Sequence, residues 1–570
     1  MSKPSFDHYY LYEELEEFLV QINLSHPDIT KLQSIGKTPQ GRDIWLLELS
    51  SREKDPGKKP GFYIDANTHA SEVTGSAVCI KTIWELASGY GKDPFITELL
   101  DNRTIYVNPR VDPDGSELFL TTPENAGGCG RMYPWTDEEW ERAEGLVGSD
   151  LDGDGHITQM RKMDPNGEWK ISDADPRFVE IRKPEDKEGP FFRLYTEGMI
   201  KNYHGQEIVM APRKYNLNIN RNYPGDFVPH PKQWGAGPYA LSEPETRAVA
   251  EFFLSHSNIA GLMTYHTNGG NLPRVFDDKP DTHYVDIGCE KDLEIFKELG
   301  EVATRMTGYR QVSSYEGFTR DKRVSRHGCT DGYTYLHHGI LGFCMELWDM
   351  AGQAGMPEFI ERGGIEFRWP NIAKEDAVKL LKWNDEKLNG EGFQNWTEYD
   401  HPQLGKVEIG GWRTKYTWRN PPPGKYLEEE VEKTYRFALI HASLLPEVEI
   451  TEAKATDMGD GVYRVQVNVA NNGFQSTSLT QMAEKRKFAK PVIAQIKVPE
   501  GVEILSTRDW INLGSIDGRA EKLPGLLKPA PAGEGHVKTA EWLIRGKKSA
   551  KVTVKMSSEK AGVAKATISL

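Results

Sequence analysis

One segment of the sequence places an imidazole and a carboxylate three residues apart, directly after a short apolar run. In YIDANTHASEVTGS, residues 63–76, His69 and Glu72 follow a run that is typical of a buried strand. With 15 histidines and 85 acidic residues in 570, about two such pairs are expected by chance, so the spacing alone is weak. A polar helix start would explain it. The alternative is a metal site, because both side chains can reach one Zn²⁺ ion from a single turn.

A third ligand candidate lies far along the chain. In IAGLMTYHTNGG, His266 follows an apolar run and precedes a glycine-rich turn, which repeats the placement of His69. A single histidine at such a position is usually a structural polar residue. A catalytic zinc needs three protein ligands and an open position for water, however, and His266 can supply the missing ligand.

Glu346 stands in the apolar segment GILGFCMELWD, where a buried strand is expected. Burying an unpaired carboxylate is costly, so this position implies a metal ion, a cationic partner or a raised pKa. A glutamate beside a zinc-bound water would serve as a general base.

The segment YNLNINRNYPGDF contains Asn220, Arg221 and Asn222 in a row. A guanidinium fork flanked by amides suits the recognition of a carboxylate. Without the other motifs, the simpler interpretation is a solvated turn.

The elements that must position these residues alternate between strands and helices. Residues 10–22 and 76–88 show helical spacing of apolar residues, and residues 35–50 are typical of a hairpin. This alternation indicates an α/β fold, with a mixed, mostly parallel sheet and helices on both faces. Ligands bind at the carboxyl ends of strands in such sheets, which is where His69 and Glu72 lie.

The composition of the chain changes twice along its length. Residues 1–445 form the predicted catalytic domain, and a long insertion rich in Gly, Pro, Asp and Trp interrupts it at about 117–210. After Pro446, apolar and polar residues alternate with period two in several short runs. Residues 446–570 are therefore predicted to form a C-terminal β-sandwich domain.

The overall composition excludes several classes of protein. The formal net charge of −15 argues against binding to nucleic acid or to an anionic membrane. The sequence has neither an apolar run of membrane-spanning length nor an apolar leader at its start. Its five cysteines are scattered and contain no Cys-x-x-Cys pair, which excludes a cysteine-rich zinc site. We therefore expect reduced thiols and a cytoplasmic location.

Taken in order, these motifs resemble the zinc metallocarboxypeptidases of the carboxypeptidase A type. The similar motifs are HASE at 69–72, NRN at 220–222, the strand-end His266, and the ELWD that contains Glu346. The segments IGKTPQGRDIWLLELS and DPDGSE are also similar to segments of that family. The resemblance covers about residues 8–440, and the C-terminal domain lies outside it.

The resemblance implies a carboxypeptidase-like fold with one Zn²⁺ ion per chain. His69, Glu72 and His266 would bind the zinc, and Glu346 would take a proton from the attacking water and pass it to the leaving amine. The family also carries a pro-segment, for which this sequence leaves no room, so zymogen control is not expected.

The resemblance further implies a set of substrate contacts. Asn220 and Arg221 would hold the C-terminal carboxylate of a peptide. The family uses another arginine to stabilise the oxyanion, for which Arg161 in QMRKMDP is our choice and Arg131 in CGRMYPW the competitor. Tyr315 in SSYEGF is the candidate for the tyrosine that closes over the substrate.

The segment DLDGDGHITQMR, residues 150–161, has the spacing of a calcium-binding EF-hand loop. The twelfth position, which should be a bidentate glutamate, is Arg161. We favour a Ca²⁺ ion whose last ligand comes from elsewhere, such as Asp164, over an acidic turn that pairs directly with Arg161 or Lys162. The three ligand candidates in the loop are Asp150, Asp152 and Asp154.

Three positions depart from the family. Asn218 replaces an aspartate that commonly bonds to a zinc-binding histidine, although an amide oxygen can still orient the ring. Ser71 stands where many members have an arginine that contacts longer substrates. Gly332 stands where a tryptophan is frequent, near the pocket for the terminal side chain. These differences leave the side-chain preference open.

Three functions are compatible with the sequence. The first is a carboxypeptidase that releases C-terminal residues from peptides. The second is a zinc amidase that acts on a specialised carboxylate-bearing substrate, such as an N-acyl amino acid or a cell-wall peptide. The third, which the presence of all four zinc-site residues disfavours, is a non-catalytic peptide-binding protein.

Overall fold

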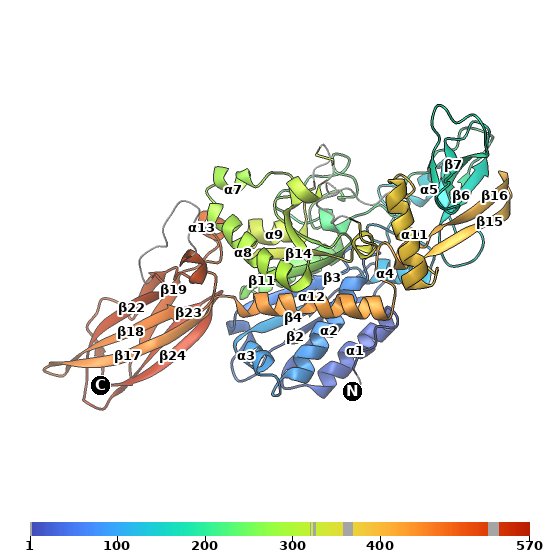
Figure 1. Ribbon diagram of the computed structural model, residues 1–570. Helices are drawn as coiled ribbons and strands as arrows, with labels where there is room; N and C mark the ends of the chain where they lie inside the picture. The colour runs from blue at the N-terminus through green and yellow to red at the C-terminus, as the bar shows by residue number, and fades with distance from the viewer. Residues whose placement is uncertain (1–2, 320, 323–325, 357–368, 523–534) are drawn as a thin grey trace.

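The computed structural model describes residues 3–319, 321–322, 326–356, 369–522 and 535–570 (Figure 1). Within these residues, the core is a mixed sheet of eight strands in the order β1-β2-β4-β3-β11-β14-β12-β13. The pairs β3–β4, β3–β11, β11–β14 and β12–β13 are parallel, and the others are antiparallel. The strands are β1 (Thr30–Lys37), β2 (Asp43–Leu49), β3 (Gly61–Ala66), β4 (Thr104–Asn108), β11 (Ile259–Thr267), β12 (Asn271–Arg274), β13 (Arg310–Ser313) and β14 (Leu341–Leu347).

Helices cover both faces of this sheet, as predicted. Successive side chains of a strand point to opposite faces. On β3, the ring of Phe62 packs against His441 of α12 (Lys425–Ser443), whereas the ring of Tyr63 packs against Phe253 of α6 (Pro244–Ser255). The remaining helices of this part are α1 (Tyr12–Ser25), α2 (Thr74–Gly89), α3 (Pro94–Asn102), α4 (Pro113–Thr121), α7 (Thr282–Asp286), α8 (Glu290–Thr307), α9 (Thr330–His338) and α10 (Met350–Gln353).

The predicted insertion contributes to a second sheet, at the right of Figure 1. Within the described residues, this sheet has the order β15-β16-β6-β9-β7-β8, so strands from the insertion pair with a hairpin from after residue 390. The sequence did not predict that hairpin. The elements here are α5 (Asp137–Glu141), β5 (Gly145–Gly148), β6 (Gln159–Met163), β7 (Trp169–Ile171), β8 (Val179–Ile181), β9 (Phe191–Thr196), β10 (Gly198–Lys201), α11 (Lys374–Leu388), β15 (Phe393–His401) and β16 (Gly405–Trp412).

The C-terminal part consists of two antiparallel sheets, at the left of Figure 1. Both sheets contribute apolar side chains to one core that is separate from the core of the large sheet. Along β18, buried and half-buried residues alternate, which is the period-two pattern seen in the sequence. The elements are β17 (Val448–Gly459), β18 (Val462–Asn471), α13 (Gln481–Lys485), β19 (Val492–Lys497), β20 (Glu503–Ile504), β21 (Trp510–Gly514), β22 (Val537–Arg545), β23 (Lys551–Ser558) and β24 (Gly562–Ser569).

No helix in the described ranges is both long and apolar enough to span a membrane.

Candidate metal centre and active site

The three predicted zinc ligands lie at the carboxyl ends of two neighbouring parallel strands. β3 ends at Ala66 and α2 begins at Thr74, so His69 and Glu72 occupy the turn between them. His266 is the second-last residue of β11, which pairs with β3. The N-terminus of α2 can lie this close to the sheet because Gly75 has no side chain; a Cβ there would be 2.8 Å from both Ala66 and Tyr265.

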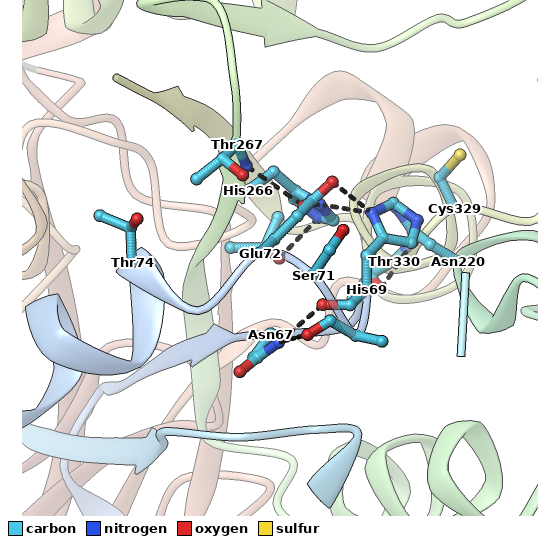
Figure 2. A network of polar contacts seen from close by, with 12 residues as sticks. Asn67, His69, Ser71, Glu72, Thr74, Asn220, His266, Thr267, Cys329 and Thr330 are labelled. Atoms are coloured by element: carbon cyan, nitrogen blue, oxygen red, sulfur yellow. Dashed lines mark hydrogen bonds and ion pairs between the residues drawn. The ribbon is translucent and has the colours of Figure 1, made fainter. Parts of the chain in front are cut away.

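The ligand atoms of these residues converge on one point (Figure 2). His69 Nδ1 lies 3.0 Å from Glu72 Oε1, and His266 Nδ1 lies 2.9 Å from Glu72 Oε2. The two Nδ1 atoms are 3.3 Å apart. Two nitrogens bound tetrahedrally to one zinc at about 2.1 Å would be about 3.4 Å apart, so the donor set fits a Zn²⁺ ion.

A second layer of polar groups orients the imidazoles. The Oδ1 atom of Asn218 lies 3.0 Å from His69 Nε2 and also accepts from the backbone N–H of Asn220. The amide oxygen can only accept, so His69 carries its proton on Nε2 and turns the lone pair of Nδ1 toward the cluster. As the sequence suggested, the amide oxygen of Asn218 therefore orients the ring without carrying a charge. On the other ligand, Thr264 Oγ1 lies 3.4 Å from His266 Nε2.

The charges within the cluster favour a bound cation. Burial alone would raise the pKa of Glu72, but the two imidazoles hold it well below its usual range. Burial alone would lower the pKa of His266, but the hydrogen bond to Glu72 raises it to about 9. A metal ion would replace the proton that this arrangement retains.

Glu346 lies directly beside the cluster. It occupies β14 at the position that pairs with His266 on β11, and it is buried. Burial and the charge of Glu72 raise the pKa of Glu346 to about 8, while His266 and nearby arginines oppose that shift. A carboxyl group with a pKa near neutrality can both accept and donate a proton at the pH of the cell.

A cavity of about 140 Å³ opens from this point. It brings together the three ligands, Glu346 and the predicted pair Asn220 and Arg221. Its other lining residues are Thr267, Asn268, Pro273, Asp277, Ser314, Phe318, Arg326, Cys329, Asp331, Cys344 and Arg419.

Arg221 projects into the cavity from a short helical turn, Ile219–Arg221. Within the described part of the chain, its guanidinium donates to the carbonyl of Asn220 and to the sulfur of Cys329. Burial raises the pKa of the Cys329 thiol, so neither partner is charged. The side chain of Asn220 is held by Thr330, which accounts for its fixed place on the wall. Arg221 therefore retains a positive charge for a carboxylate from outside.

Two acids that the sequence analysis did not single out also line the cavity. Asp331 is buried on α9, and burial together with the charge of Asp277 raises its pKa to about 7. One carboxylate oxygen of Asp277, one of Asp331 and the sulfur of Cys329 lie within 4.8 Å of one another. The signal available in the sequence was the neighbouring Gly332, which the resemblance placed near the pocket for the terminal side chain without assigning Asp331.

The two arginines predicted to stabilise an oxyanion are not brought to the cavity. Arg161 lies on β6 in the second sheet, where it forms an ion pair with Glu408 at 2.8 Å. Its guanidinium also stacks over the ring of Trp396, 4.5 Å from the centroid. Arg131 forms ion pairs with Glu243 and Glu245.

Tyr315 is not among the cavity-lining residues either, although its neighbour Ser314 and Phe318 are. Lys322 lies over the Tyr315 ring, 4.5 Å from the centroid. Instead, Arg419 reaches the cavity from a segment for which the sequence gave no functional signal.

The predicted calcium ligands do not form one group. Asp150 and Asp152 lie together with Glu197, whereas Asp154 forms an ion pair with Arg413 at 3.0 Å. Asp164, the suggested last ligand, forms an ion pair with Arg193 at 2.6 Å. A Ca²⁺ ion on the three aspartates of this loop is therefore not supported.

Comparison with known proteins identifies two regions. The family model for zinc carboxypeptidases matches residues 15–362, and a domain of unknown function matches residues 447–569. The zinc carboxypeptidase of Saccharothrix mutabilis subsp. capreolus is 35% identical over 114 residues, which are 20% of this chain and 26% of that protein. Carboxypeptidase D of Homo sapiens is 32% identical over 372 residues, which are 61% of this chain and 23% of that protein. The chain thus spans about a quarter of the length of these relatives.

Solved structures that are similar to part of the chain include two with low sequence identity. Thrombin activatable fibrinolysis inhibitor is 17% identical, and the match covers 60% of this chain and 67% of that one with a TM-score of 0.37. Carboxypeptidase A from Helicoverpa armigera is 14% identical, with coverages of 67% and 74% and a TM-score of 0.37.

Proposed function

The chain belongs to the zinc carboxypeptidase family, and we propose that it removes C-terminal residues with cationic side chains from peptides. The observation that carries this proposal is the set of charged groups that line one cavity. The cavity holds the zinc ligands, a cation for a terminal carboxylate, Arg221, and a pair of acids, Asp277 and Asp331.

His69, Glu72 and His266 would hold the zinc ion. When bound, Zn²⁺ supplies a Lewis acid that polarises the scissile carbonyl and makes a water molecule more acidic. Glu346 is placed to take the proton of the attacking water, because it is buried next to His266 and has a raised pKa. The same carboxyl group then returns the proton to the leaving amine nitrogen as the C–N bond breaks.

Arg221 makes the cleavage specific for the end of the chain. A peptide carboxylate that pairs with the guanidinium places the last amide bond toward Glu346 and the zinc ligands. An internal peptide bond offers no charge at this position. Asn220 supports the pair because its backbone carbonyl accepts a hydrogen bond from the guanidinium of Arg221.

Asp277 and Asp331 account for the proposed side-chain preference. Burial and, after it, the nearby charge of Asp277 raise the pKa of Asp331. An ammonium or guanidinium group from a substrate would relieve that repulsion. An apolar terminal side chain would leave it uncompensated.

The test is mass spectrometry of a defined peptide set incubated with zinc-loaded protein. Peptides that differ only in the last residue, Lys, Arg, Leu or Glu, are compared with the same peptides as C-terminal amides and with N-acetyl-lysine. We expect loss of Lys and Arg from the free acids, no cleavage of the amides, and abolition by a chelator that added Zn²⁺ reverses.

The remaining results distinguish the alternatives. Cleavage of N-acetyl-lysine with intact peptides would replace the peptidase by an amidase for small substrates. Equal release of all four residues would overturn the cationic preference but leave the carboxypeptidase activity. An intact set from zinc-loaded protein would overturn the proposed function.

A further inference from the structure

A segment beyond the matched family region returns to the active site. Residues 413–421, here called the strap, follow β16 of the second sheet and precede α12. The family match ends at residue 362, so no residue of the strap belongs to it. Its residue Arg419 nevertheless lines the cavity together with the zinc ligands and Glu346.

The strap is fixed to the elements that carry the zinc site. Asn420 is fully buried; its amide donates to the carbonyl of Ser71 at 2.8 Å, and its Oδ1 accepts from the hydroxyl of Thr74 at 2.8 Å. These two residues flank Glu72. The carbonyl of Trp418 accepts from Asn268, which follows β11, the strand of His266.

A third attachment joins the strap to the strand of the predicted general base. The indole N–H of Trp348 donates to the carbonyl of Thr417 at 2.7 Å, and Trp348 lies two residues after Glu346. The strap is thus hydrogen-bonded to residues that lie within two positions of Glu72, of His266 and of Glu346 in the sequence. Such attachment gives the side chain between these bonds, that of Arg419, a defined position.

The guanidinium of Arg419 faces the metal site without a close ion pair. Its Nη1 lies 3.8 Å from Glu72 Oε1 and 3.4 Å from the carbonyl oxygen of Thr267. Its Nε is buried and has no hydrogen-bond acceptor among the described residues. Ser71, next to Glu72, is small and buried, so no long side chain from the zinc-binding turn occupies this space. The guanidinium therefore has donors left for a ligand.

We propose that Arg419 is a catalytic residue that donates hydrogen bonds to the oxygen of the scissile carbonyl. This inference rests on the proposed function. With the substrate carboxylate on Arg221, the last amide carbonyl lies one residue nearer to Glu346 and Glu72, which is where Arg419 points. When the oxygen of water bonds to the carbonyl carbon, the carbonyl oxygen becomes negatively charged, and the guanidinium stabilises that charge. The electron pair on this oxygen then re-forms the C=O bond as the C–N bond breaks. The amine leaves with the proton that Glu346 took from the water.

The other arginines near the site have different positions. Arg161 and Arg131 are held in ion pairs outside the cavity. Arg221 is assigned to the terminal carboxylate. Arg326 also lines the cavity and, like Arg419, opposes the rise in the pKa of Glu346, but its guanidinium stacks over the ring of Phe318, 4.5 Å from the centroid.

The experiment compares the wild type with Arg419→Gln, Arg419→Lys and, as a matched control from the same strap, Arg413→Gln. Arg413 forms its ion pair with Asp154 in the second sheet and does not line the cavity. We expect Arg419→Gln to lower kcat about 100- to 1,000-fold with a much smaller change in KM, as for other oxyanion donors. Zinc content should stay at one ion per chain, added guanidinium should restore part of the rate, and Arg413→Gln should behave as the wild type.

A second measurement keeps this inference separate from the proposed function. Peptides with a phosphonate in place of the last amide carry a charged oxygen at the same position, and calorimetry gives their affinity whether or not the chain is active. A wild type that cleaves no peptide would overturn the proposed function. The role of Arg419 would then be tested by comparing the phosphonate affinities of the wild type and Arg419→Gln. An Arg419→Gln variant with wild-type kcat, or with wild-type affinity for the phosphonate, would overturn the inference.

Discussion

His69, Glu72 and His266, here called the zinc corner, come from the ends of two paired strands. Other charged residues that line the cavity are assembled differently. We define the cavity wall as Arg221, Asp277, Asp331 and Arg419, and these four come from a short turn, a loop, a helix and the strap. The zinc corner is therefore fixed by strand pairing, whereas the wall depends on how separate segments pack against one another.

We therefore expect the zinc corner and Glu346 to determine the chemistry, and the cavity wall to determine the selectivity. Strand register places the zinc corner and Glu346 within one part of the sheet, so changes elsewhere in the chain have little effect on their spacing. The wall can change its charges without disturbing that sheet. We expect variants of the two groups to fail in different ways.

The largest effect should come from the residue beside the zinc corner. Glu346→Gln keeps the shape of the side chain but cannot accept a proton, so kcat should fall by about 10²- to 10⁴-fold. Bound zinc, measured by metal analysis, should be unchanged because Glu346 is not a ligand. Loss of zinc from this variant would show that Glu346 contributes to metal binding and is not only the general base.

A change in the wall should alter selectivity and spare the chemistry. Asp331→Asn removes one of the two acids, and a charged hydrogen bond of this kind is worth about 10- to 100-fold in discrimination. The ratio of kcat/KM for Lys-ending over Leu-ending peptides should fall by that factor. The matched variant Asp277→Asn should act in the same direction. An unchanged ratio in both variants would show that the acids do not face the substrate side chain.

A smaller effect is expected where the two groups meet. Asn218 orients His69 and begins the turn that carries Arg221. Asn218→Ala should weaken zinc binding about tenfold, because the ring loses its hydrogen-bond acceptor. Competition with a chelator of known affinity would measure this. Asn218→Asp should strengthen binding, and equal affinities for all three proteins would contradict the role of the amide.

The smallest effect on activity, and a distinct effect on stability, is expected from α12, which packs on the sheet and does not line the cavity. His441 on α12 is buried among aromatic rings, and neither ring nitrogen has a partner among the described residues. Burial lowers its pKa to about 3, below the value of about 6.5 in an unfolded chain. The unfolded chain therefore binds a proton that the folded protein rejects. The free energy of unfolding should fall by up to about 1.4 kcal/mol per pH unit between pH 6.5 and 3.

Urea titrations at pH 7.5 and 5.0 would measure this loss. His441→Phe should reduce the difference between the two pH values and leave kcat/KM at neutral pH unchanged. The same pH dependence in both proteins would assign the acid sensitivity to other groups.

The sequence predicted the zinc corner because its signals are local. His69 and Glu72 share one turn, and the runs before His69 and His266 mark the strands that bring them together. Asn220 and Arg221 were found for the same reason. The fold of the large sheet followed from the alternation of strands and helices, including the hairpin that forms β1 and β2.

The prediction for Arg161 was wrong because the order of residues along the chain does not fix where an insertion folds. The insertion pairs with β16, and stacking on Trp396 holds the Arg161 side chain in that sheet. Arg419 was missed for the opposite reason. It follows a hairpin with weak apolar patterning, and the sequence TWRNPPPG is typical of a simple turn. Only the contacts of the folded chain bring it to the zinc corner.

The position of the strap also determines when the last residue of the proposed active site is synthesised on the ribosome. The zinc ligands and Glu346 are synthesised first, and a further 75 residues separate Glu346 from the end of the strap at Pro421. At typical synthesis rates of about 5 to 20 residues per second, that interval lasts roughly 4 to 15 s. During this time the chain would carry its proposed metal ligands but would lack the guanidinium that we propose for the scissile carbonyl. If both proposals hold, late synthesis of this one side chain would delay full activity until the strap has been made.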